Sequence, residues 1–104
     1  MGHLIVCGVN FHFHPLAIRE HLVIPDSCLK HGLMALGQFP HLDESVILST
    51  CNRTEVYAVV SDISKGFAEI DSFFRSVQQV TDHASLSPNY KLMGDDVALH
   101  LMRV

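Results

Sequence analysis

The chain has 104 residues, of which 48% are apolar, so it is long enough for one compact domain and too apolar for a disordered chain. No apolar run reaches the roughly 18 residues of a membrane span. The net charge of −4, from 7 basic and 11 acidic side chains, excludes a broad cationic surface for nucleic acid. Three cysteines, with no C-x-x-C pair, favour reduced thiols over a disulfide framework. We therefore expect a cytoplasmic domain without a membrane segment.

The first part of the chain alternates strand and helix signals. Residues 4–10 form an apolar run rich in β-branched side chains, which predicts a buried strand, and Gly8 within it indicates a close backbone approach. Residues 16–22 fit one or two helical turns. A second helix is predicted to begin at residues 25–27 (PDS) and to end at Gly37, before a proline. Its apolar stripe is predicted at Leu29, Leu33 and Leu36.

Two further strands are predicted over residues 44–50 and 54–61. Because only three residues separate them, they should form an antiparallel hairpin. Asp62 and Ser64 can then cap a helix. The apolar residues of that helix follow helical spacing at Phe67, Ile70, Phe74, Val77 and Val80.

The last part of the chain is predicted to be a polar loop over residues 82–89, a short strand over residues 90–93 and a helix that begins at Asp95. The apolar face of this helix is predicted at Val97, Leu101 and Val104. The element order is therefore β-α-β-β-α-β followed by the start of a helix. That order predicts an α+β, ferredoxin-like fold, a four-stranded antiparallel sheet with helices on one face. The fold class does not predict a function by itself.

The densest polar cluster, residues 49–55 (STCNRTE), lies at the hairpin connection, where side chains at the end of a sheet can face a ligand. Cys51 is the reactive candidate, because a thiolate attacks an activated acyl carbon and forms a thioester. Arg53 carries a cation that would favour this thiolate. On chemistry alone, a small core cysteine is the commoner reading of such a residue.

Residues 47–57 (ILSTCNRTEVY) resemble the signature of the glutamyl-tRNA reductases. Residues 8–10, 15–20, 22–25 and 96–104 (DVALHLMRV) are similar to further segments of that family in the same order. The resemblance implies that residues 1–104 are the N-terminal substrate-binding and catalytic domain. We expect the chain to be truncated before the NADPH-binding and dimerisation domains of such an enzyme.

The resemblance also implies a reaction, which opens tetrapyrrole synthesis. Cys51 would attack the ester carbonyl of glutamyl-tRNA(Glu), and NADPH would reduce the glutamyl thioester to glutamate-1-semialdehyde. Arg53 would hold the glutamate side chain with its guanidinium fork. Thr50 and Asn52 would add hydrogen bonds to the substrate. His100 would orient the ester or exchange a proton near neutral pH.

The chain has no G-x-G-x-x-G fingerprint, so we expect NADPH to be bound by the missing domain. Alone, the chain would be at most a glutamyl-tRNA esterase. The family further implies a full-length homodimer formed through the missing region, no metal and no membrane, in the cytoplasm or, for a plant protein, the plastid stroma.

Two alternatives stay open at this stage. Residues 11–14 (FHFH) depart from the family's usual His-Lys-Thr-Ala run. Within them, His12 and His14 have the H-x-H spacing of two metal ligands, and Cys51 or His100 could be a further ligand. The chain could instead be a non-catalytic binding or regulatory module descended from the reductase.

Overall fold

The computed structural model describes residues 2–10, 26–50, 52–81 and 90–103. Four strands form one antiparallel sheet in the order β2-β3-β1-β4. The predicted βαββαβ order and fold class are confirmed, whereas the predicted turns at residues 16–22 and the loop at residues 82–89 lie outside the described residues. In chain order the elements are β1 (His3–Asn10), α2 (Asp26–Leu36), β2 (Leu42–Ser49), β3 (Arg53–Val60), α3 (Ile63–Thr81), β4 (Tyr90–Met93) and α4 (Asp95–Arg103).

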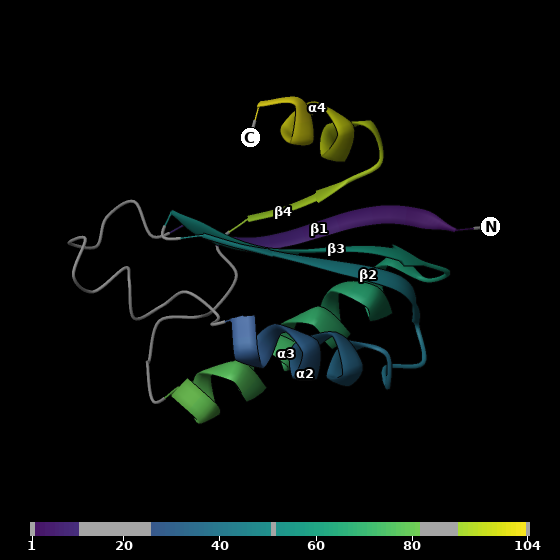
Figure 1. Cartoon of the computed structure of the whole chain (residues 1–104). Coiled ribbons are helices and arrows are strands. Elements are labelled where there is room, and N and C mark those ends of the chain that lie inside the picture. The colour runs from purple at the N-terminus through teal and green to yellow at the C-terminus, as the bar shows by residue number, and fades with distance from the viewer. Residues whose placement is uncertain (1, 11–25, 51, 82–89, 104) are drawn as a thin grey trace.

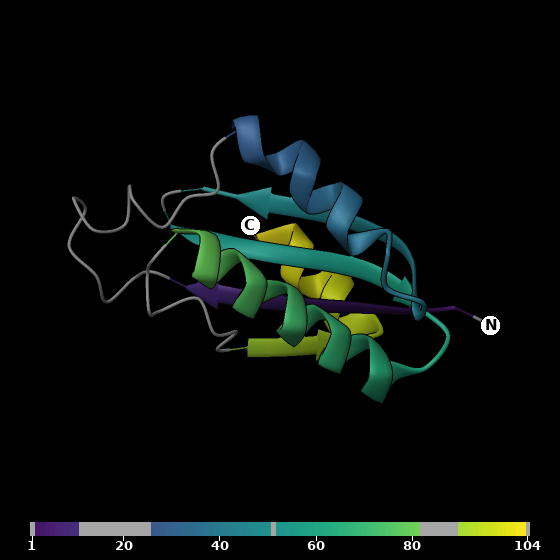
Figure 2. The same ribbon diagram turned by 90° about the horizontal axis from the view of Figure 1, so that it is seen from below.

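The sheet separates two layers of helices. Helices α2 and α3 lie together on one face, as the element order predicts, and α4 lies on the opposite face (Figure 1). The view from below shows the same arrangement, with α2 and α3 in front of the strands and α4 behind them (Figure 2). The end of the chain therefore covers the sheet face that the first two helices leave open.

The larger core lies between the sheet and the helices α2 and α3. It forms because alternate residues of β1 and β3 are apolar on this face, where burial stabilises each large side chain by about 1.5–3 kcal/mol. Its buried members come from the five elements β1, α2, β2, β3 and α3: Ile5, Cys7, Val9, Leu36, Leu42, Val56, Ala58, Val60, Ile70, Phe73 and Phe74.

Helix α2 packs through two of the three residues of its predicted stripe. Leu36 is buried and Leu29 is half-buried, but Leu33 is 43% exposed. The close contact is made by Gly32, where an added Cβ would lie 3.1 Å from Ile47 Cδ1 and 3.5 Å from Phe73 Cζ. The missing side chain lets the helix approach the sheet, and this rotates Leu33 toward solvent.

Helix α3 follows its predicted pattern closely. The Lys65 amide donates to Asp62 Oδ1 at 3.0 Å, which confirms Asp62 as the cap. Ile70 and Phe74 are buried as expected, and Phe73 is buried as well, edge-on to Phe74 with ring centroids 5.8 Å apart. The side chains of residues 77–81, which include the predicted Val77 and Val80, lie outside the described part of the chain.

Helix α4 is placed by the turn that precedes it. Gly94 has φ of 61°, a left-handed conformation that favours glycine, and its amide donates to the Leu4 carbonyl at 2.9 Å. The chain thus reverses after β4, and Val97 becomes buried against Val6 and Tyr57. The predicted apolar face is wrong at Leu101, which is 48% exposed; Val104 lies outside the described residues. The sheet-facing pair is instead Val97 and His100, three residues apart.

None of the helices over residues 26–36, 63–81 and 95–103 is both long and apolar enough to cross a membrane.

Candidate functional site

The hairpin between β2 and β3 is held by the Thr50 side chain and backbone. Thr50 Oγ1 accepts hydrogen bonds from the backbone amides of Asn52, at 3.1 Å, and Arg53, at 3.2 Å. The Thr50 amide donates to the Arg53 carbonyl at 2.8 Å, which closes the turn. Cys51 occupies the turn in sequence and lies outside the described residues, so its predicted role as nucleophile stays a prediction. The threonine hydroxyl therefore shapes the turn around position 51.

Strand β3 sends Arg53, Glu55 and Tyr57 to one face of the sheet, because successive side chains of a strand alternate. This is the face that α4 covers, since Tyr57 packs on Val97. Glu55 has no exposed surface, which is rare for a carboxylate unless it is fully paired. A charged side chain at such a position calls for specific partners.

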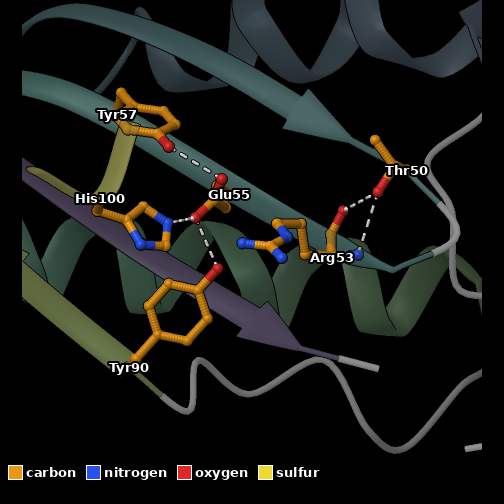
Figure 3. A network of polar contacts seen from close by, with 6 residues as sticks. All are labelled: Thr50, Arg53, Glu55, Tyr57, Tyr90 and His100. Carbon is orange, nitrogen blue, oxygen red and sulfur yellow. Dashed lines mark hydrogen bonds and ion pairs between the residues drawn. The ribbon is translucent and has the colours of Figure 1, made fainter. Parts of the chain in front are cut away.

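Three polar side chains converge on the Glu55 carboxylate (Figure 3). The Tyr57 hydroxyl donates to Oε1 at 2.9 Å, and the Tyr90 hydroxyl donates to Oε2 at 2.6 Å. His100 Nε2 also contacts Oε2, 45 residues away along the chain. An ionised carboxylate is acceptor-only and has room for all three donors. The network therefore joins β3, β4 and α4 around one negative charge.

Gly8 makes this network sterically possible. It lies on β1 between its register partners Glu55 on β3 and Tyr90 on β4. A Cβ at Gly8 would overlap the Tyr90 ring, so the tyrosine crosses β1 over bare backbone to reach the carboxylate. The close approach predicted at Gly8 is confirmed, and the approaching group is a side chain.

The two tyrosines are firm donors. Burial raises the pKa of both Tyr57 and Tyr90 above the usual range, and the hydrogen bond to Glu55 and its negative charge raise it further. The Arg53 guanidinium opposes this rise in both cases. Both hydroxyls thus keep their protons at neutral pH and point them at Glu55.

Arg53 extends along the same face toward Glu55 and Tyr90 (Figure 3). The side chain is half-buried. Among the described residues it belongs to no ion pair: those present join His41 to Glu69, Lys91 to Asp71 and His100 to Glu55. A guanidinium fork beside a buried network and below an exposed turn can hold a ligand carboxylate in two hydrogen bonds.

The comparisons with known proteins agree on one family. A family model described as "Glutamyl-tRNAGlu reductase, N-terminal domain" matches residues 7–104. The chain belongs to this family. Glutamyl-tRNA reductases of Microcystis aeruginosa and of Synechocystis sp. are each 37% identical to it over 101 residues, which cover 97% of this chain and 24% of the relative. That of Synechococcus elongatus is 38% identical over 103 residues, 98% of this chain and 23% of the relative. The chain thus spans about a quarter of the length of these curated relatives.

The predicted site residues of this reductase N-terminal domain fall into two places. Thr50, Asn52 and Arg53 lie together at the hairpin, and His100 lies on α4, joined to β3 through Glu55. The structure adds Glu55, for which the sequence predicts only membership of the polar cluster over residues 49–55. A glutamate that opens the apolar run EVYAVV was the available signal, because a charge in a buried strand needs partners.

The two described cysteines, Cys7 and Cys28, differ in burial. Burial raises the pKa of the Cys7 thiol to about 12, with Asp71 adding to the rise and Lys91 opposing it. Cys7 is therefore a protonated core residue at neutral pH. Cys28 lies exposed on α2, on the far side of the sheet from the Glu55 network.

The metal alternative is not tested by the described residues. His12 and His14, which carried it, lie outside them. Within residues 2–10, 26–50, 52–81 and 90–103, no three histidine, cysteine or acidic side chains are grouped as metal ligands would be.

Proposed function

We propose that this domain carries the acyl-transfer half of a glutamyl-tRNA reductase, with Cys51 as the nucleophile. The observation that carries the proposal is the arrangement on one face of β3: the turn that contains position 51, then Arg53, then the buried Glu55 with His100. An anion-binding group, Arg53, thus follows a cysteine in sequence on β3, and a proton-exchanging group, His100, reaches the same strand from α4. Membership of the reductase family supports the same chemistry.

In the proposed step, the Cys51 thiolate attacks the carbonyl carbon of the ester that joins glutamate to its tRNA. A carbon–sulfur bond forms, the carbon–oxygen bond to the ribose breaks, and the ribose oxygen takes up a proton as the tRNA leaves. Arg53 holds the side-chain carboxylate of the glutamate. His100 is the group proposed to supply or accept the proton. The product on the domain is a glutamyl thioester.

The residues of this chain do not fit NADPH. The sequence contains no G-x-G-x-x-G turn, and the described sheet is antiparallel, without the parallel βαβ unit that places a dinucleotide at a helix N-terminus. We propose that the remaining three-quarters of a reductase-length chain binds the cofactor, supplies the hydride that yields glutamate-1-semialdehyde for tetrapyrrole synthesis, and forms the homodimer. For this domain alone the proposal is limited to thioester formation and its slow hydrolysis.

The test is the release of glutamate from glutamyl-tRNA by the 104-residue chain without NADPH. We expect the release to depend on Cys51, and mass spectrometry to find one glutamyl group on that residue. Cys51→Ser should lose both signals. Cys28→Ser, which removes the exposed thiol of α2, is the matched control and should keep both. Equal release by the wild type and Cys51→Ser, with no adduct, would refute the catalytic proposal and favour a binding module.

A further inference from the structure

Glu55 has no part in the acyl transfer proposed above, yet it is the most completely buried charged side chain described. Its burial needs an explanation, because a buried ion pair seldom stabilises a fold more than well-packed apolar groups would. If the only task were to attach α4 to the sheet, apolar contacts such as that of Val97 with Val6 would suffice. The three donors instead point to a task for the charge itself.

The hydrogen bonds determine where the proton of His100 lies. Tyr57 and Tyr90 both donate to the carboxylate, so Glu55 acts as an acceptor on both oxygens. When Glu55 is ionised it has no proton to donate, so its remaining contact, with His100 Nε2, is a hydrogen bond only if Nε2 carries the proton. In the neutral ring this leaves Nδ1 as the nitrogen that can accept a proton. The ring is also held in orientation, since its side chain is only 19% exposed and packs beside Tyr90 at 5.5 Å between centroids.

We propose that Glu55 is a positioning residue that fixes the tautomer and orientation of His100, so that Nδ1 exchanges the proton in acyl transfer. The carboxylate also compensates the positive charge that the ring gains when Nδ1 takes up a proton, as the aspartate of a serine-protease triad does for its histidine. Tyr57 and Tyr90 hold the carboxylate in place and keep it an acceptor. The catalytic role of Nδ1 rests on the proposed function. The tautomer of His100 does not depend on it.

The first measurement is nitrogen NMR of isotope-labelled histidine in the wild-type chain, with His100 assigned through His100→Gln. We expect the proton of neutral His100 on Nε2. His41 is an internal control that should show the other tautomer. Its Nδ1 lies 3.0 Å from Glu69 Oε2 and should carry the proton. A proton on Nδ1 of His100, or an even mixture of both tautomers, would overturn the inference without reference to activity.

The second measurement is a double-mutant cycle on Cys51-dependent release of glutamate. Glu55→Gln keeps the shape of the side chain and removes its charge. We expect it to slow release by about tenfold or more in the wild-type background, since positioned proton transfer contributes about 10²–10⁴-fold. In a His100→Gln background the same change should cost less than about twofold, because Glu55 acts through His100.

Glu69→Gln is the matched control, since it removes a histidine-bound carboxylate elsewhere and should leave release unchanged. An equal loss from Glu55→Gln in both backgrounds would mean a purely structural role and would overturn the inference. If Glu55→Gln does not fold, the tautomer in the wild type decides alone. If the wild type itself shows no Cys51-dependent release, the proposed function fails, and the tautomer still decides the structural part.

Discussion

At the residue scale, the burial of Glu55 explains several neighbours that look unrelated in the sequence. Tyr57 shares its strand, Tyr90 reaches it from β4, and His100 reaches it from α4. Each of them would be costly to bury alone, and each satisfies a polar group of another. The chain's two tyrosines are both in this network, and it has no tryptophan. Tyrosine absorbance therefore reports on this site alone.

This gives a prediction for alkaline titration. Because the pKa of each tyrosine is raised above its usual range, neither should ionise in the folded chain at about pH 11, where roughly nine-tenths of ordinary tyrosines are ionised. Tyrosinate absorbance should appear only when urea unfolds the chain. Ionisation of one tyrosine near pH 10 in the folded chain would show that its hydroxyl does not donate to Glu55.

At the element scale, two glycines position the helix and strand that carry the network. Gly8 leaves the surface of β1 open for Tyr90, and Gly94 turns the chain after β4 so that α4 crosses the far face of the sheet. The reasons differ, because Gly8 is required for space and Gly94 for its backbone angle. A Cβ at Gly94 would meet nothing within 4 Å.

Alanine at these two positions should therefore have different consequences. Gly94→Ala should lower the free energy of unfolding by about 1 kcal/mol, the cost of a left-handed backbone for alanine, and leave the network intact. Gly8→Ala should cost about 1–3 kcal/mol through overpacking and displace the Tyr90 ring. Urea unfolding measures the loss of unfolding free energy in each variant. Alkaline titration detects the displacement of Tyr90, because the displaced tyrosine should ionise at lower pH in Gly8→Ala and not in Gly94→Ala.

At the scale of the whole molecule, the sheet divides the domain into an apolar layer and a polar one. The layer with α2 and α3 holds most of the core, including the Cys7 thiol. The layer with α4 holds a small apolar cluster beside the Glu55 network. Most of the apolar core and the Glu55 network thus lie on opposite faces of the sheet, and a substitution can be placed in one layer without entering the other.

The apolar layer should make the fold sensitive to high pH. The Cys7 thiol has its pKa raised from 9.0 to about 12 in the folded chain, so the folded state holds this proton more tightly than the unfolded state does. The associated stability is fully present below about pH 9 and is lost as pH rises toward 12. Between about pH 8.5 and 10.5 the loss from this group should be on the order of 1–2 kcal/mol.

The free energy of unfolding should be measured for the wild type and for Cys7→Ala at both pH values. Over this interval, Cys7→Ala should lose about 1–2 kcal/mol less than the wild type. The cavity that alanine leaves lowers stability equally at both pH values and so cancels in the difference. Identical pH dependence of urea unfolding in the two proteins would show that the thiol is accessible to water in the folded state.

The sequence by itself determined the element order, the hairpin around position 51 and the cap at Asp62, because periodicity, turn length and capping are local properties. It also pointed to the family, through a motif that lies within one hairpin. It failed at Leu33 and Leu101, which follow helical spacing but face solvent. In each helix a residue that is not a large apolar one faces the sheet instead, Gly32 in α2 and His100 in α4. Helical spacing of apolar residues cannot predict such a position.

Only the tertiary structure decided that α4 covers the opposite face of the sheet and that Glu55 is the partner of His100. The chain reverses toward that face at Gly94, and the pairing joins β3 to α4 through residues 45 positions apart. No local pattern encodes such a contact, because a buried charge is defined by donors that converge on it only after the strands and the helix have packed.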